Sequence, residues 1–246
     1  RLRTDIIELD SSIFMHARVW EASGHVAGFS DPLVDCRNCK KRFRGDKLLE
    51  EKLGVEAVAG LPLEQVQPRL LQEGILCPHC GASDWTTARQ FNLMFETEQG
   101  LGEGDADHIY LRPETAQGIF INFKHIVETA NKELPLGVAQ IGKAFRKEIT
   151  PGHFLFRTRE FEQMEIEYFV HPDAWEAAFE QWLEAVWNWY LSFGISPERL
   201  RKREHEKKEL SHYSKRTVDI EYKFPWGWGE LSGLAYRGDH DLRQHE

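Results

Sequence analysis

Two segments with strand-like alternation, set around a Pro-Gly turn between residues 142 and 169, constrain this chain more than any other feature. Successive side chains of a strand point to opposite faces. In the second segment, one face carries a ring, an amide and two carboxylates: Phe161, Gln163, Glu165 and Glu167. The other face is apolar and predicts a core: Met164, Ile166, Tyr168 and Val170. The polar face makes a poor core and a good binding surface, because unpaired buried polar groups cost free energy.

The first segment of the hairpin also presents charge. One face holds two small residues, which leave room, beside two charged ones: Gly142, Ala144, Arg146 and Glu148. A guanidinium forks onto phosphate oxygens and an aromatic ring stacks on a base, so the hairpin favours a nucleotide-like ligand with a cationic group for Glu165. An exposed hairpin with cross-strand ion pairs would give the same alternation and stays an alternative.

Four ordered motifs resemble those of one enzyme family. The run FRKE at 145–148, a loop and RTREF at 157–161 are similar to motif 2 of class II aminoacyl-tRNA synthetases. The runs RPETAQG at 112–118, FEQME at 161–165 and GWGEL at 227–231 resemble signatures of the dimeric glycyl-tRNA synthetases. The resemblance extends over nearly the whole chain. It implies an α+β fold, in which helices flank the antiparallel sheet of a class II synthetase-like catalytic core.

The resemblance also implies a reaction and a set of partners. Glycine and ATP would give glycyl-adenylate, and the glycyl group would pass to the 3′ end of tRNA(Gly). ATP would be a substrate, Mg2+ would assist it, and the protein would be a cytoplasmic homodimer. By the same resemblance, Arg146 would hold the α-phosphate and Arg157 the γ-phosphate as catalytic cations.

Further site residues follow from the matched motifs. The ATP-binding residues would be Arg146, Lys147, Glu148, Phe156, Arg157, Phe161, Glu230 and Leu231. The glycine-binding residues would be Glu114, Gln163, Glu165 and Arg44. Glu230 would help to hold Mg2+. Arg237 falls on the opposite strand face from Glu230 unless that strand bulges, so its role is left open.

All four cysteines belong to one pattern, Cys36-x2-Cys39 followed by Cys77-x2-Cys80. Two such turns complete a tetrahedral sulfur site, which predicts structural Zn2+. A cytosolic chain disfavours disulfides, and reduced thiols without a metal stay the alternative. Basic residues beside the first pair leave nucleic-acid binding by this segment open: Arg37, Lys40, Lys41, Arg42 and Arg44.

The pattern predicts a zinc-knuckle module at residues 36–84, inserted into a catalytic core made of residues 1–35 and 85–246. Leucine spacing predicts helices within residues 46–75, interrupted at Gly54, Gly60 and Pro62. Further helices are expected over residues 113–134, 172–193 and 197–215. The aromatic stripe of 172–193 is expected to pack against the sheet. Strands are expected over residues 219–224 and 230–237.

Composition sets the outer limits. The 246 residues carry a net charge of −9, which argues against broad nonspecific attraction to nucleic acid. No apolar run approaches the roughly 20 residues that a membrane helix needs, so no membrane contact is expected. Because the chain starts at Arg1 rather than Met, we expect an excerpt without motif 3 or an anticodon-binding domain.

Two other functions remain open at this point. A class II-like accessory subunit would keep the fold and lose the phosphate ligands, whereas Arg146, Arg157, Glu114 and Glu165 are present. A zinc-dependent nucleic-acid-binding module would need only residues 36–84, and its affinity would fall steeply with salt.

Overall fold

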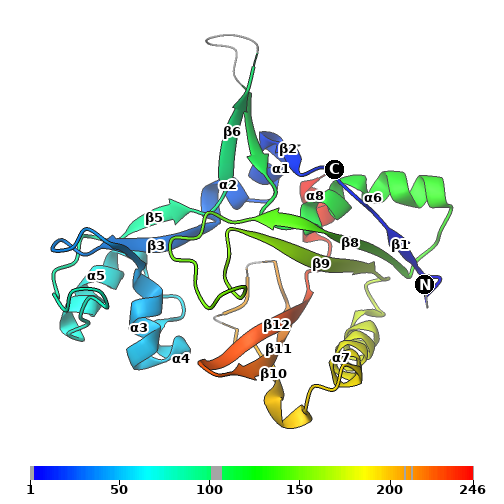
Figure 1. Cartoon of the computed structure of the whole chain (residues 1–246). Coiled ribbons are helices and arrows are strands. Elements are labelled where there is room, and N and C mark those ends of the chain that lie inside the picture. Colours follow the sequence, from blue (N-terminus) through cyan, green and yellow to red (C-terminus); the bar gives the residue numbers. More distant parts are fainter. Residues whose placement is uncertain (1–2, 101–106, 208, 212, 246) are drawn as a thin grey trace.

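The computed structural model describes residues 3–100, 107–207, 209–211 and 213–245. At its centre lies the predicted hairpin, formed by β8 (Leu136–Phe145) and β9 (Glu160–Phe169), which pair antiparallel (Figure 1). The register places Gly142 opposite Gln163 and Ala144 opposite Phe161. A short strand, β1 (Ile6–Glu8), adds a parallel edge to β8. The two polar faces that alternation predicted therefore form one continuous surface.

A second antiparallel sheet stands beside the hairpin. It consists of β2 (Phe14–His16), β7 (Asp107–Leu111) and β6 (Phe95–Gln99), with β7 in the middle. Two short helices, α1 (Ala17–Ala22) and α2 (His25–Gly28), follow β2. The longer helix α6 (Ala116–Ala130) follows β7. The helix predicted from residue 113 therefore exists but starts at Ala116, because the segment after β7 turns first and Thr115 occupies the N-cap position.

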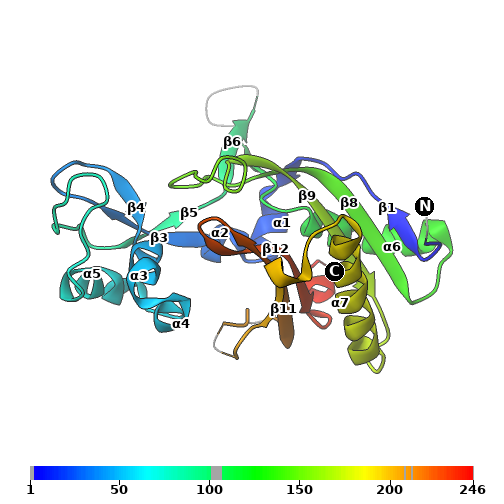
Figure 2. The same ribbon diagram turned by 60° about the horizontal axis from the view of Figure 1, so that its bottom comes forward.

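The cysteine pairs lie at one end of the molecule, in a unit built on a third antiparallel sheet (Figure 2). Its strands are β3 (Ser30–Asp35), β4 (Arg42–Arg44) and β5 (Arg89–Asn92), with β3 in the middle. Its helices are α3 (Gly45–Leu53), α4 (Val55–Val58) and α5 (Leu63–Gln72). They are separated at Gly54 and Gly60, as expected. A separate hydrophobic cluster, which includes Trp85 and Leu70, fills this unit, so it has a core of its own.

The fourth sheet corrects one prediction. A charged helix was expected over residues 197–215, but Pro197–Arg199 is a short 3-10 turn (η1) and Leu200–Glu204 is the strand β10. The alternating side chains of β10 find partners across the sheet, since Arg201 ion-pairs with Glu221 and Leu200 is buried. Such cross-strand pairing outweighs the weak helical preference of a charged segment. Lys208 and His212, also in the expected helix, lie outside the described residues.

Strand β10 pairs with β11 (Arg216–Phe224), and β11 pairs with β12 (Gly227–Tyr236). The strands predicted over residues 219–224 and 230–237 are therefore present as parts of β11 and β12. The ladder between β11 and β12 has a bulge after Ile220. Helix α7 (Trp175–Ser192) packs against this sheet, with Phe179 and Leu183 buried. The predicted packing of its aromatic stripe is thus confirmed in the main, although Trp189 remains 43% exposed.

The predicted core face of β9 is wrong. Met164 and Ile166 are 53% and 38% exposed, and Ile141 beside them on β8 is 69% exposed. The opposite face, with Glu165 and Glu167, is the more enclosed one. Alternation identifies two faces correctly but cannot say which one other elements cover. Here the segment before α6 lies against the carboxylate face, through the contact of Thr115 with Glu165.

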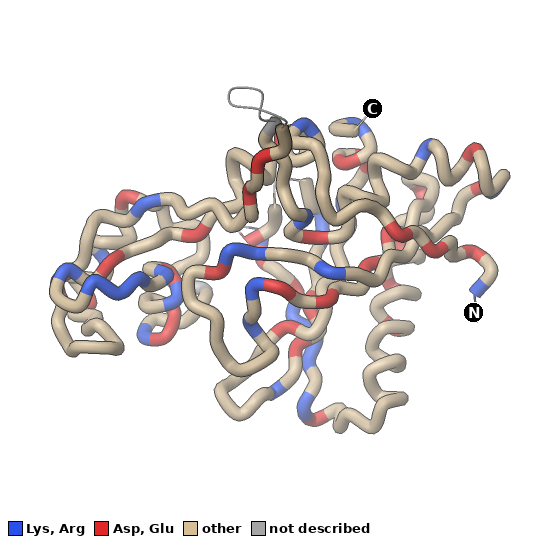
Figure 3. The backbone as a smooth tube through the Cα atoms, turned by 45° about the horizontal axis from the view of Figure 1, so that its top comes forward, with Lys and Arg blue, Asp and Glu red and all other residues tan. Residues whose placement is uncertain are grey.

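The last helix of the described residues is α8 (His240–Gln244), which packs against α6. Among the described residues, no helix combines the length and the apolar composition that spanning a membrane requires. Basic and acidic segments lie interspersed along the described part of the tube (Figure 3). This distribution fits the expectation drawn from net charge.

Candidate functional site

Glu165 is anchored at the start of α6. Its Oε2 accepts the backbone N–H of Thr115 at 2.7 Å and also the Thr115 hydroxyl. Burial and the nearby charge of Glu114 raise the pKa of Glu165, while the two bonds from Thr115 oppose that rise. The carboxylate is therefore held in one place and sits beside a second acid.

Glu114 occupies the junction between β7 and α6. Its Oε1 lies 3.4 Å from Nε2 of His25. Burial by itself would raise the pKa of Glu114, but the His25 ring and the charges of Arg146 and Arg237 outweigh burial and lower it to about 2. The pKa values of these two neighbouring carboxyls are thus shifted in opposite directions. Glu114 is firmly ionised, and Glu165 holds a proton more readily. Such a pair favours a small cation between its members.

The charge of Arg146 acts on both members of this pair. Its Nε donates to the carbonyl oxygen of Pro113 at 3.0 Å. Its guanidinium lies 5.4 Å from the Phe29 ring and 5.3 Å from the Phe161 ring. Its charge lowers the pKa of Glu114, Glu165 and Glu230 against the raising effect of their burial. Arg146 therefore lies near the paired acids and near Glu230, and its guanidinium contacts the Phe161 ring.

Gln163 lies next to Glu165 on the polar face of β9. Its Nε2 donates to Oε1 of Glu165 at 3.4 Å. Its own Oε1 is buried without a hydrogen-bond partner among the described residues. A buried carbonyl oxygen without a donor is costly, so this atom marks a place where a ligand N–H or a water would bind.

The space that Gly142 was expected to leave for a ligand is taken. A Cβ at Gly142 would collide with Nη2 of Arg112, a residue that is only 2% exposed. Nε of Arg112 donates to Lys143 O at 2.7 Å, and Nη1 donates to Ser11 O at 2.7 Å. The glycine therefore serves close packing of a buried arginine, and the expectation of free room beside it is wrong.

A second group of charges lies around Arg44. Its guanidinium ion-pairs with Asp31 at 2.9 Å and with Asp46. Glu148 affects the pKa of both Arg44 and Asp31, and its Oε2 lies 3.4 Å from Nη1 of Arg157. Among the described residues, the side-chain partners of Arg44 are therefore Asp31 and Asp46, and the carboxylates of Glu114 and Glu165 are not in contact with it.

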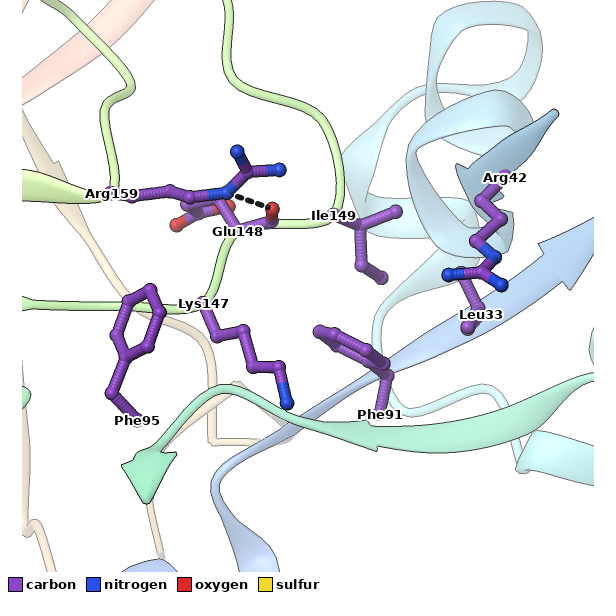
Figure 4. Close-up of a pocket in the computed structure, with 8 residues that line it drawn as sticks. All are labelled: Leu33, Arg42, Phe91, Phe95, Lys147, Glu148, Ile149 and Arg159. Carbon is purple, nitrogen blue, oxygen red and sulfur yellow. Dashed lines mark hydrogen bonds between the residues drawn. The ribbon is translucent and has the colours of Figure 1, made fainter. Parts of the chain in front are cut away.

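Between the cysteine-bearing unit and the hairpin is a groove of about 470 Å³ (Figure 4). Three cations and two phenylalanines lie along it, together with Glu148: Arg42, Lys147, Arg159, Phe91 and Phe95. Nζ of Lys147 lies 5.5 Å from the Phe91 ring. Positive charge beside aromatic rings is the combination that single-stranded nucleic acid favours.

The remaining ATP-site candidates lie on or against β12. Phe156 contacts Phe224, with ring centroids 4.9 Å apart, and packs on Gly229, so the hairpin loop reaches the strand that carries Glu230. Burial and the charge of Asp219 raise the pKa of Glu230. The Leu231 side chain instead joins the hydrophobic cluster of α7, which leaves its main chain as the part that a ligand could reach.

Arg237 comes directly after β12 and takes part in the acid cluster. It binds both carboxylate oxygens of Asp241, with bonds of 2.6 and 2.7 Å. Its charge lowers the pKa of Glu114 and Glu167 against the effect of their burial. The condition left open for its face is met, because β12 bulges at Leu231: Glu221 pairs with Glu230 and Ile220 with Ser232, which reverses the alternation before Arg237.

The four cysteines meet in one cluster, with all Sγ atoms within 4.8 Å of one another. The Sγ atoms of Cys36 and Cys80 are 3.6 Å apart, as are those of Cys39 and Cys77. Ligands at the usual Zn–S distance in a tetrahedron are separated by about 3.8 Å. A hydrogen bond from Asn38 and one from the Ala82 backbone lower the pKa of Cys80 to about 6, which favours the thiolate. The donor set therefore fits a metal such as zinc.

Some residues of the site carried no signal in the sequence. His25, Asp31 and Asp46 touch the candidate residues only because the chain folds back on itself. Thr115 belongs to the run RPETAQG, which gave it no role, and its contact with Glu165 comes from the fold. Their positions match no charge alternation and no metal spacing. A sequence motif can propose ligand residues, but the partners that hold those residues need coordinates.

This chain belongs to the family described as the tRNA synthetase class II core domain (G, H, P, S and T), whose model matches residues 95–232. Among curated proteins, it is 55% identical to a glycine–tRNA ligase of Geobacillus thermodenitrificans over 97% of the chain. It is 54% identical to that of Geobacillus kaustophilus and 53% identical to that of Alkaliphilus oremlandii. The chain spans about half the length of these relatives, 52–53% of each.

Glu167 provides a pH test of the acid cluster. Burial, then the charge of Glu165, raises the pKa of Glu167 from 4.5 to about 8. As pH rises above 4.5, the unfolded chain loses this proton while the folded protein keeps it, so stability falls until about pH 8. We expect Glu167→Gln to come close to the wild type near pH 5 and to be more stable near pH 8.5, by on the order of 4 kcal/mol.

Urea unfolding of both proteins at the two pH values measures this difference. Glu162→Gln, on the exposed face of the same strand, is the matched control and should show no such pH dependence. An equal stability difference at both pH values for Glu167→Gln would contradict a raised pKa.

Proposed function

We propose that this chain forms the glycine- and ATP-binding core of a glycine–tRNA ligase. The observation that carries the proposal is that Glu114, at the junction before α6, lies near Glu165 of β9, with Arg146 close to both. Two acids around a small ammonium group suit glycine, whose lack of a side chain lets them approach closely. Larger amino acids would meet the same carboxylates and clash.

The adjoining charges suit the ATP part of the reaction. Arg146 would hold the α-phosphate, Arg157 the γ-phosphate, and Phe161 would stack on the adenine. Lys147, Glu148 and Phe156 would line the same nucleotide site. The glycine carboxylate would attack the α-phosphorus and pyrophosphate would leave, so positive charge placed at the phosphate would stabilise the transition state. This step needs no general base or covalent nucleophile.

Glu230 is the residue that we propose as the ligand for Mg2+ with ATP. Burial and the neighbouring carboxylates of Asp219 and Glu221 raise its pKa, so a cation placed there would relieve their repulsion. When bound, Mg2+ would neutralise phosphate charge. The main chain of Leu231 would adjoin the nucleotide.

The groove in Figure 4 supports tRNA as the second substrate. Arg42, Lys147 and Arg159 could bind backbone phosphates, and Phe91 could stack on a base of the 3′ end. This groove adjoins the nucleotide site through Glu148, so an acceptor end in it would reach the adenylate. The homodimer and the cytoplasmic location follow from the resemblance and belong to the same proposal.

We also propose that Cys36, Cys39, Cys77 and Cys80 hold a structural Zn2+. The spacing of their sulfur atoms supports four ligands around one ion, which leaves no open position for substrate. A module that only binds nucleic acid would use this site alone. The enclosed carboxylates on β9 favour the ligase instead, because nucleic-acid binding gives them no role.

Glycine-dependent ATP–pyrophosphate exchange by the full-length protein tests the central proposal. Glu165→Gln should lower kcat/KM for glycine by about 10- to 100-fold, since a charge-assisted contact with the ammonium is lost. The control Glu162→Gln changes a neighbouring carboxylate on the other face of β9 and should leave exchange unchanged. Exchange that is equal in Glu165→Gln and wild type would remove Glu165 from the glycine pocket.

Metal analysis tests the cysteine site. We expect one zinc per chain, and Cys77→Ser should release the metal and lower the unfolding temperature of the unit that contains Trp85, because a structural site contributes folding energy directly. Ser83→Ala, between the second cysteine pair and Trp85, is the control that should keep both zinc and stability. Wild-type protein purified without chelators and free of zinc would contradict the assignment.

A further inference from the structure

His25 is the closest described neighbour of Glu114 that no motif identified. It begins α2, directly after Gly24, whose φ of 79° lies in the left-handed region and turns the chain. Nε2 of His25 lies 3.4 Å from Oε1 of Glu114, and the two side chains are only 12% and 19% exposed. The contact therefore joins a buried ring to the acid that we place at the glycine ammonium.

The His25 ring is held on every side. Its centroid lies 5.4 Å from Trp20 and 5.2 Å from Phe29, the ring that also lies under Arg146. The Asn92 side chain donates to the carbonyl oxygens of His25 and Val26, at 3.3 and 2.9 Å. A ring fixed by this many neighbours can orient a carboxylate without losing further conformational entropy.

The contact between Ser23 and Nδ1 decides which protonation form of the His25 ring offers an N–H from Nε2 to Glu114. Its Oγ lies 2.8 Å from Nδ1 of His25 and 3.3 Å from the carbonyl oxygen of Trp20. If the hydroxyl donates to Trp20, Nδ1 must donate to Ser23, and only the imidazolium then offers a proton to Glu114. If the hydroxyl donates to Nδ1, the neutral ring carries its proton on Nε2. Both arrangements that avoid repulsion with the carboxylate place an N–H toward Glu114.

We propose that His25 is a positioning residue for glycine recognition, which holds Oε1 of Glu114 and so directs Oε2 at the substrate ammonium. The inference rests on the proposed function and adds to it a residue that does not touch the substrate. The low pKa of Glu114 agrees with this arrangement, because His25 is the first of the neighbours that counter its burial. Glu165 is held by a different device, its bonds to Thr115.

A pair of amide substitutions separates the two ring nitrogens. The amide of His25→Gln reaches the place of Nε2 and can donate to Glu114, whereas that of His25→Asn reaches only the place of Nδ1. In full-length protein, His25→Asn should raise KM for glycine roughly tenfold, with KM for ATP and kcat within about twofold of wild type. His25→Gln should stay within about threefold in all three constants. His125→Gln, an exposed histidine on α6, is the control and should resemble wild type.

Double variants complete the test. In a Glu114→Gln background, His25→Asn should raise KM for glycine no further, since the two residues act through one contact. Equal effects of His25→Asn and His25→Gln, or additive effects with Glu114→Gln, would overturn the positioning role. The proposed function fails differently: wild-type protein would then show no glycine-dependent exchange, whatever residue stands at position 25.

Discussion

The bond from the Thr115 backbone to Glu165 is the constraint on which the rest of the site depends. It joins the first turn before α6 to the middle of β9, two elements that lie far apart in the sequence. Because Glu114 precedes Thr115, the same bond sets the separation of the two acids. The N–H at a helix start is a natural partner for a carboxylate, since it has no partner within the helix. One short contact therefore sets how close the two acids lie, while His25 contacts the Glu114 carboxylate itself.

Around this pair the protein accepts arrangements that are costly for folding alone. Glu165 and Glu167 are raised in pKa by burial, while Met164 and Ile166 on the reverse face remain exposed. A chain selected only for stability would place these side chains the other way round. A strand with acidic side chains on its enclosed face and apolar side chains on its exposed face is expected where a functional site takes precedence over packing. Cations at Arg146 and Arg237 limit the cost by countering the buried negative charge.

The sequence predicted the hairpin, its polar face and the cysteine cluster because each rests on local spacing. Alternation along β9 grouped Phe161 with Glu165, and two C-x2-C turns required only that their ends meet. Which face of β9 is covered could not be predicted, since that depends on elements distant in the sequence. The strand at Leu200–Glu204 was missed for a related reason: its charges are explained by partners such as Glu221 on β11. Roles for the individual site residues came from family motifs, and their holding partners, such as His25 and Thr115, came only from the fold.

The central claim is that two carboxylates enclose the amino group of glycine while Arg146 and Phe161 face the nucleotide. A crystal structure of the full-length protein with glycine and a non-hydrolysable ATP analogue measures this directly. We expect the glycine nitrogen at hydrogen-bond distance, about 3 Å, from Glu114 and Glu165, with the adenine against Phe161. Glycine bound with its nitrogen away from both carboxylates, or an adenine placed in another part of the protein, would contradict the account.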